Sequence, residues 1–368
     1  MAYVGVVAAM AVLRLIFARD TDRDRRIFST LTLVLLLFFA ACRAPSVGRD
    51  TASFIDVFLK LRGRGLLDIL RFSSWTEPGF RLLCALVGLF TANGQWLIAV
   101  TSLLIHGSVA RFICRHSRNI YLSFFLYVTL MIYPFYFSMM RQALAVAVWL
   151  FAYGFLKKRK LVPYLLLVLL AASFHTSALL FLVCPLLALV RVDRQGLRIL
   201  LPLTVGLSLA GALFAEPAVH LVTRLIPRYA NYEVTTFDAL YWYFAVFVLI
   251  TGYGIFKLYY VRSDVPPVAT DGFDEKSFLT VMMLLGTVVA ATMTRFGQLE
   301  RLFNYFEVLY LLWLPMVISP AFYRKGERRL AFPVELIVTL LLSLAYFIVI
   351  LFFRSGLWYD AMPYTFFW

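Results

Sequence analysis

The chain has 368 residues, of which 62% are hydrophobic and 15% are charged, and its mean hydropathy is +0.84. This balance excludes an ordinary soluble domain and is typical of a polytopic membrane protein, because no polar stretch is long enough to form a separate soluble domain. The formal net charge is +15, and part of it lies in arginine-rich turns between apolar segments, where cationic residues mark the cytoplasmic side.

Hydropathy predicts about twelve membrane-spanning helices of about 15–23 residues each, with both chain termini outside. The first has no A-x-A-like cleavage site, so we expect a retained span and not a signal peptide. In chain order the expected spans are residues 2–18, 27–45, 95–113, 119–137, 139–156, 161–175, 176–190, 198–215, 241–260, 277–294, 302–321 and 331–353. The sequence therefore predicts an all-α protein with a single integral membrane domain over residues 1–368.

Segment 79–93 is apolar but short, and it carries Arg81. If it crossed the membrane, the basic turns at 157–160 (KKRK) and 324–329 (RKGERR) would both face outward, against the positive-inside trend. We therefore expect this segment to be re-entrant or to lie in the membrane interface.

Two long outward loops follow from this topology. Residues 46–78 contain TASFIDVFLKLRGRGLLDILRF, in which apolar residues recur at helical spacing beside Lys and Arg, as in an amphipathic helix on a membrane surface. Residues 216–240 are rich in aromatic and polar residues, and we expect them to form a periplasmic loop that acts as a lid.

Arg141 and His175 occupy positions in apolar segments, where an ionisable group is costly in a membrane protein and therefore indicates a functional role. They stand at the far ends of two apolar segments, 139–156 and 161–175, which the KKRK turn joins. If the segments pack as a hairpin with this turn inside, Arg141 and His175 meet at the outward face. Because the pKa of histidine lies near neutrality, His175 is suited to accept a proton from a hydroxyl. A packing role for His175 is the alternative.

Arginines also collect on the outward side, where topology does not require them. A guanidinium binds phosphate oxygens in a bidentate manner, and Arg141 lies near a helix N-terminus, where exposed N–H groups also favour an anion. We expect phosphate on a lipid or substrate as the partner, and no nucleic acid. Snorkelling to lipid headgroups is the alternative. The candidates for the phosphate are Arg43, Arg141, Arg295 and Arg301. The other outward arginines are Arg49, Arg62, Arg64, Arg71, Arg81, Arg224, Arg228 and Arg354.

Two outward carboxylates complete the candidate site. Asp50 follows the second span, and Glu77 begins the EPGF turn. A carboxylate beside arginines stays ionised and is suited to orient sugar hydroxyls. The alternative for Asp50 is an ion pair with Arg43 or Arg49.

Cysteine and histidine spacing gives no sign of a metal site. The four cysteines lie in apolar surroundings without a C-x-x-C spacing, and the four histidines are scattered without an H-E-x-x-H pattern. We therefore expect neither a metal nor another cofactor.

The order of the segments RAPSVGRDTASF, EPGF, RQALAVA, ASFHTSALL and RLFNYFEV resembles the EpsG/Wzy-type family of polysaccharide polymerases, over about residues 30–320. The resemblance implies an inner-membrane glycosyltransferase with a GT-C-like arrangement of helices. It would join repeat units carried on undecaprenyl diphosphate at the outer face of the membrane. Phe54 departs from the pattern, because relatives commonly have Tyr there. The residues that match the family's motifs are Arg43, Asp50, Glu77, Arg141, Gln142, His175 and Arg301.

The residues and the resemblance together predict a polysaccharide polymerase of the bacterial inner membrane, with its active site facing the periplasm. His175 is expected to be the base, Asp50 and Glu77 to orient sugar hydroxyls, and the four arginines with Gln142 to bind the diphosphate. Expected partners are lipid-linked donor and acceptor glycans, membrane lipids and a chain-length regulator protein. A glycan ligase of the same chemistry, and a flippase or exporter of lipid-linked sugars, are the alternatives; an acyltransferase is disfavoured because no acyl-donor motif is recognisable.

Overall fold

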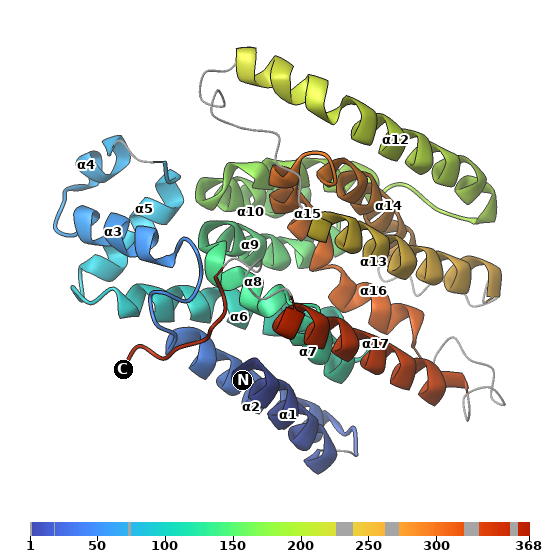
Figure 1. Ribbon diagram of the computed structural model, residues 1–368, viewed down its shortest axis with the longest axis horizontal. Helices are drawn as coiled ribbons and strands as arrows, with labels where there is room; N and C mark the ends of the chain where they lie inside the picture. The colour runs from blue at the N-terminus through green and yellow to red at the C-terminus, as the bar shows by residue number, and fades with distance from the viewer. Residues whose placement is uncertain are drawn as a thin grey trace. The chain divides into compact units, whose positions relative to one another are not determined.

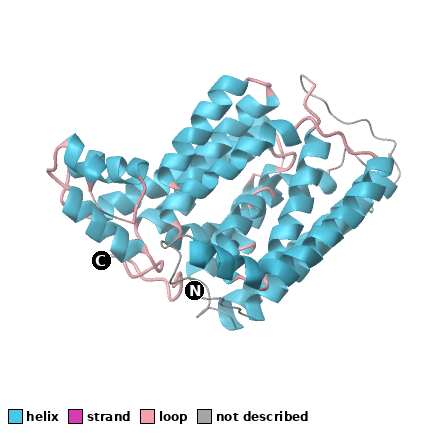
Figure 2. Cartoon of the chain, turned by 90° about the horizontal axis from the view of Figure 1, so that it is seen from above, coloured by secondary structure: helices cyan, strands magenta, loops and turns pink. Residues whose placement is uncertain are grey.

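The computed structural model describes residues 2–17, 19–72, 75–225, 238–261, 272–319, 331–353 and 360–368. Within these ranges every regular element is a helix, which confirms the all-α prediction (Figures 1 and 2). The β-type pairing in the same ranges is an isolated bridge between Arg43 and Phe366. The chain divides into two compact units: unit 1 comprises Met1–Leu182 and Lys325–Trp368, and unit 2 comprises Val183–Arg324.

The protein is a polytopic membrane protein, but fewer helices reach spanning length than the expected twelve. Among the described residues, five helices are long and apolar enough to cross a membrane, or six if one bent pair counts as a single span. The five are Gln95–His116, Arg194–Leu221, Phe244–Val261, Glu275–Met293 and Pro333–Phe353, and the bent pair is Ile120–Thr129 with Ile132–Ser138. Several other expected spans are shorter helices, so a count of twelve remains a prediction.

Unit 1 is built on an antiparallel hairpin of two helices, α9 and α10, around the KKRK turn (Figure 1). The Trp149 indole stacks on Phe181 with ring centroids 4.0 Å apart, and Tyr164 donates a hydrogen bond to the Phe181 carbonyl at 2.7 Å. The helices of unit 1 are α1 (Ala2–Ile16), α2 (Asp22–Ala41), α3 (Thr51–Leu61), α4 (Leu66–Arg71), α5 (Pro78–Gly88), α6 (Gln95–His116), α7 (Ile120–Thr129), α8 (Ile132–Ser138), α9 (Met140–Lys157), α10 (Leu161–Phe174) and α17 (Ala331–Phe353). The 3-10 helix η1 (Thr176–Val183) follows α10.

One end of unit 1, which we call the Glu77 end, gathers segments of this unit that are far apart in the sequence. Tyr3 donates to the Ala361 carbonyl at 2.7 Å, and the Gly48 amide donates to the Asp360 carbonyl at 2.8 Å. The next residue, Arg49, donates its amide to Ser138 Oγ at 3.1 Å. Both described ends of the chain therefore lie at the same end of unit 1.

The opposite end of unit 1, which we call the basic end, holds residues 19–21, 117–119 and 158–160. The Arg14 guanidinium lies 4.0 Å from the centroid of the Tyr121 ring, and the His116 and Tyr153 ring centroids are 5.1 Å apart. The 18 residues of α9 run from the Glu77 end to the basic end, a length of about 27 Å. The KKRK turn therefore lies at the far end of unit 1 from Arg141, as predicted.

The expected amphipathic loop 46–78 contains α3 and α4. The apolar face of α3 is buried, with Phe54, Phe58 and Leu61 at most 1% exposed, and it packs on α5. The expected re-entrant segment 79–93 contains α5, whose 11 residues are too few to cross a membrane. Gln95 at the start of α6 donates to the carbonyls of Ala41, the last residue of α2, and of Arg43. The chain therefore enters and leaves this short helix at the Glu77 end.

Unit 2 consists of α11 (Cys184–Leu187), α12 (Arg194–Leu225), α13 (Asp238–Ile255), the π-helix η3 (Phe256–Val261), α14 (Glu275–Met293), the 3-10 helix η4 (Gly297–Leu299), α15 (Glu300–Glu307) and α16 (Tyr310–Val317). Residues 216–225 of the expected lid 216–240 continue α12 as a helix, and residues 226–237 lie outside the described residues. The lid therefore stays a prediction. The expected span 302–321 is divided between α15 and α16.

Candidate functional site

The carboxylate of Glu77 is the centre of a cluster at the Glu77 end of unit 1. Its Oε2 forms an ion pair with the Arg141 guanidinium, and its Oε1 lies 3.2 Å from His175 Nδ1. The Thr176 amide also donates to Oε1, at 3.4 Å. The side chains are largely buried, with 13% exposure for Arg141 and Glu77 and 17% for His175. The structure thus brings together three of the residues that the sequence predicts for the site.

The sequence around Glu77 explains how its side chain reaches this position. Glu77 has an extended backbone immediately before α5, and Pro78 occupies the first turn, where its missing N–H costs nothing. The next residue, Gly79, touches the end of α10: a Cβ at this position would lie 2.3 Å from Ser173 Oγ and 2.8 Å from the Ser173 carbonyl oxygen. Only glycine permits this approach, which carries Glu77 toward His175.

His175 stands at the junction between α10 and η1. Its backbone is extended, with φ −155° and ψ 116°, so the chain turns away from the axis of α10 before η1 begins. Because Nδ1 faces Glu77, the other ring nitrogen, Nε2, is the one that remains for a second partner. This division of the two nitrogens is the arrangement that a histidine base needs.

Arg141 is the second residue of α9, where the helix dipole and the exposed N–H groups favour an anion. It is held from two further directions. Its guanidinium donates to the Trp75 carbonyl at 3.3 Å and lies 4.4 Å from the centroid of the Trp75 ring. The Phe54 ring, 5.8 Å away, closes another side, and this position has no hydroxyl. The contacts of Trp75 with Arg141 were not predicted from the sequence.

Electrostatics keep Glu77 ionised. Burial raises the pKa of its carboxyl, but the hydrogen bond from His175 and the charge of Arg141 outweigh burial and hold its pKa at about 2, against an ordinary value of 4.5. At neutral pH the cluster therefore contains a carboxylate shared between a guanidinium and an imidazole.

Arg43 has a different environment from the one predicted. Its side chain is 2% exposed and donates to the Ala40 carbonyl at the C-terminal end of α2 and to Ser102 Oγ at 3.0 Å. Its guanidinium also lies 4.6 Å from the centroid of the Phe137 ring. A cation is favourable at this end of a helix dipole, and these contacts are those of a residue that joins α2, α6 and α8.

Asp50 and Gln142 flank the cluster along the chain. Asp50 is half-buried at the start of α3, where its side chain does not cap the helix, and within the described ranges its carboxylate has no hydrogen-bond or ion-pair partner. The alternative for Asp50, an ion pair with Arg49, is not formed, because Arg49 pairs instead with Asp360 at 3.3 Å. Gln142 follows Arg141 in α9 and is 3% exposed.

Arg295 and Arg301 lie in unit 2, on either side of η4, and both are exposed. They belong to a different compact unit from the cluster, so their place in a shared site stays a prediction. Among the described residues, no group of three or more His, Cys, Asp or Glu side chains has an arrangement that holds a metal ion.

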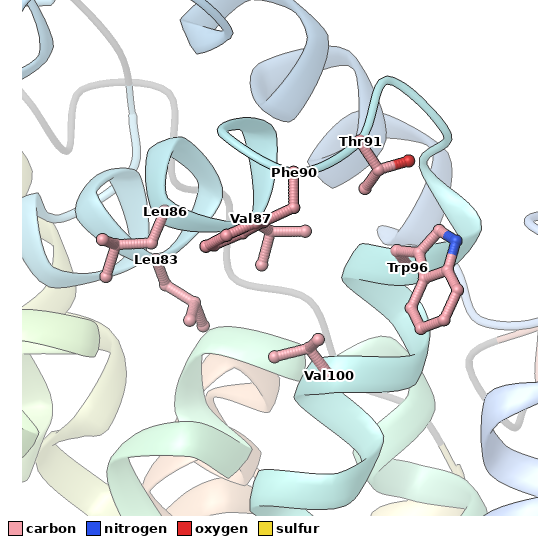
Figure 3. Close-up of a pocket in the computed structure, with 7 residues that line it drawn as sticks. All are labelled: Leu83, Leu86, Val87, Phe90, Thr91, Trp96 and Val100. Carbon is pink, nitrogen blue, oxygen red and sulfur yellow. The ribbon is translucent and has the colours of Figure 1, made fainter.

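An apolar groove lies along the C-terminal half of α5 (Figure 3). It has a volume of about 530 Å³ and is lined by Leu83, Leu86, Val87, Phe90 and Thr91 from α5 and the residues after it, and by Trp96 and Val100 of α6. The helix that begins beside Glu77 thus ends in a surface suited to hydrocarbon.

Among known proteins, no curated protein and no solved structure gives a significant match to this chain. The EpsG family model, in contrast, matches residues 26–366, a range that contains every residue of the cluster. The protein therefore belongs to the EpsG family, which is associated with exopolysaccharide biosynthesis.

Proposed function

We propose that this protein is a membrane glycosyltransferase that polymerises oligosaccharide repeat units carried on undecaprenyl diphosphate. The proposal rests on one observation: Arg141 and His175 both contact the carboxylate of Glu77. Arg141 is suited to bind phosphate, and His175 is suited to accept a proton from a hydroxyl. Membership of the EpsG family supports the polysaccharide product.

The placement of charge supports a site at the outer face of the inner membrane. The basic end of unit 1 carries the KKRK turn, and cationic turns stay in the cytoplasm. The Glu77 end lies about 27 Å away along α9, close to the thickness of the hydrocarbon core. In this orientation the cluster meets lipid-linked substrates after they have crossed the membrane.

Arg141 is assigned to the diphosphate of the donor. A guanidinium fixed by the Trp75 carbonyl and ring needs little reorganisation when charge develops on the leaving group. The apolar groove along α5 is consistent with a substrate that carries a hydrocarbon chain. Arg295, Arg301 and Gln142 remain proposed diphosphate ligands, whereas we reassign Arg43 to a structural role because of its buried contacts.

His175 is assigned as the base. The acceptor hydroxyl gives its proton to His175 Nε2 as its oxygen forms a bond to the anomeric carbon of the donor. The bond between that carbon and the diphosphate oxygen breaks, and undecaprenyl diphosphate leaves with the electron pair. Asp50 remains the proposed group for orienting a sugar hydroxyl, since its carboxylate is not engaged elsewhere in the described residues.

The experiment that tests the function supplies purified full-length protein in lipid vesicles with lipid-linked repeat units. A polymerase yields a ladder of products that differ by one repeat unit. A single transferred block identifies a ligase instead, and movement of the lipid-linked unit across the vesicle without a new glycosidic bond identifies a flippase. A chain-length regulator protein, if added, is expected to change the length of the ladder.

A further inference from the structure

Glu77 divides its two oxygens between two groups that the proposed reaction uses at different moments. Oε2 faces Arg141, which would bind the donor, and Oε1 faces His175, which would deprotonate the acceptor. Because all three side chains are largely buried, water screens these interactions weakly. A change in the charge near one partner of Glu77 therefore alters how strongly the carboxylate interacts with the other partner.

This sharing holds both groups back. The guanidinium is partly neutralised by Glu77, so it offers less charge to an incoming anion. The carboxylate is partly neutralised by Arg141, so it supports a positive charge on the imidazole less than a carboxylate alone would. Neither Arg141 nor His175 has its full reactivity while Glu77 serves both.

We propose that Glu77 couples donor binding to activation of the base. When a diphosphate binds Arg141, it takes the place of Glu77 Oε2 on the guanidinium, and the carboxylate then acts on His175 alone. The imidazole Nδ1–H donates a hydrogen bond to Glu77, and Nε2 takes up the hydroxyl proton of the acceptor more readily only after the donor has arrived. This inference rests on the proposed function and makes Glu77 a positioning residue, not a group that touches the sugar.

The surrounding contacts allow this exchange without collapse of the cluster. Arg141 stays in place through the carbonyl and ring of Trp75. Glu77 stays in place through the Thr176 amide and through the close packing of Gly79 on Ser173. Each partner of the ion pair thus has its own support.

The test measures binding of inorganic pyrophosphate to the purified full-length protein by calorimetry, without any glycan. Glu77→Gln removes the competing charge, so we expect it to bind pyrophosphate about tenfold more tightly than the wild type, equivalent to about 1.4 kcal/mol. In the polymerisation assay the same variant should show a lower KM for the donor and a kcat reduced by about 100-fold, because His175 loses its charged partner. Asp22→Asn, at an exposed carboxylate in the first turn of α2 and far from the Glu77 end, is the control and should change neither quantity.

Weaker or unchanged pyrophosphate binding by folded Glu77→Gln overturns the coupling. If that variant does not fold, Glu77→Asp serves instead: its shorter carboxylate cannot reach both partners, so pyrophosphate binding should again tighten. If the wild type makes ladders but the Glu77 variants do not bind pyrophosphate more tightly, the coupling is wrong and the polymerase function stands. If the variants bind pyrophosphate more tightly but the wild type makes no ladders, the polymerase function is wrong and the effect of Glu77 on anion binding stands.

Discussion

Glu77 Oε1 lies 3.2 Å from His175 Nδ1, although the two residues are 98 positions apart in the chain. The contact depends on how closely the start of α5 approaches the end of α10. A hydrogen bond between a carboxylate and Nδ1 fixes the tautomer of an imidazole and stabilises its protonated form. The packing of the start of α5 on the end of α10 therefore sets the position of the Glu77 carboxylate against His175 Nδ1.

Gly79→Ala tests this packing. The added methyl group would lie 2.3 Å from Ser173 Oγ and 2.8 Å from the Ser173 carbonyl oxygen, so α5 must move away from α10. We expect a loss of about 1–3 kcal/mol in the free energy of unfolding and a marked loss of turnover. Gly107→Ala in α6 is the control, because a Cβ there meets nothing within 4 Å. Wild-type turnover and thermal stability in Gly79→Ala would show that the close approach is dispensable.

Stability should depend on acid through Glu77. Its pKa in the folded protein is about 2, below the ordinary 4.5, so its ionised form stabilises the fold. This contribution is complete above pH 4.5 and is lost as the pH falls toward 2. The wild type should therefore have a higher Tm than Glu77→Gln at neutral pH, and the difference should shrink between pH 4.5 and 2. A difference in Tm that is constant across this range would argue against a low pKa.

Arg141 should matter through its shape as well as its charge. Arg141→Lys keeps the charge but loses the planar fork and the stacking on Trp75, so we expect the donor KM to rise about tenfold. Arg141→Ala should raise it further. Arg62→Lys, at an exposed arginine of the same outward loop region, should leave KM unchanged. Equal effects at both positions would indicate general attraction of lipid headgroups instead of a specific site.

The orientation of the chain is testable by cysteine labelling. In a background without Cys42, Cys84, Cys114 and Cys184, a cysteine in place of Lys158 should react only with a reagent on the cytoplasmic side. A cysteine in place of Trp75, which is 48% exposed, should react from the periplasm. Labelling of position 158 from the periplasm would invert the protein and move the cluster to the wrong face for the proposed substrates.

The meeting of Arg141 and His175 could be predicted because only local rules were needed. Two apolar segments of matched length around a basic turn form a hairpin, so their far ends meet. The roles of Glu77 and Arg43 could not be predicted in the same way. Glu77 is brought in by the packing of Gly79 on Ser173, and Arg43 is drawn inward by the end of α2. Both are tertiary contacts that leave no periodic signal.

The number of spans was also difficult to predict from hydropathy. The mean hydropathy of a segment reflects its composition but does not reveal breaks in the backbone of a helix. Residues 119–137 read as one continuous span, yet Met131 adopts a left-handed conformation with φ 65° and separates α7 from α8. The expected span 302–321 is also interrupted, because α15 ends at Glu307 and α16 begins at Tyr310.

We propose that His175, held by Glu77, removes the proton of the acceptor hydroxyl. The single-turnover rate of glycosidic bond formation tests this role for the wild type, His175→Ala and His116→Gln, with donor binding measured in parallel. His175→Ala should slow bond formation by about 10²–10⁴-fold while the donor still binds, and His116→Gln, at the basic end of unit 1, should match the wild type. Bond formation by His175→Ala at the wild-type rate would show that His175 is not the base.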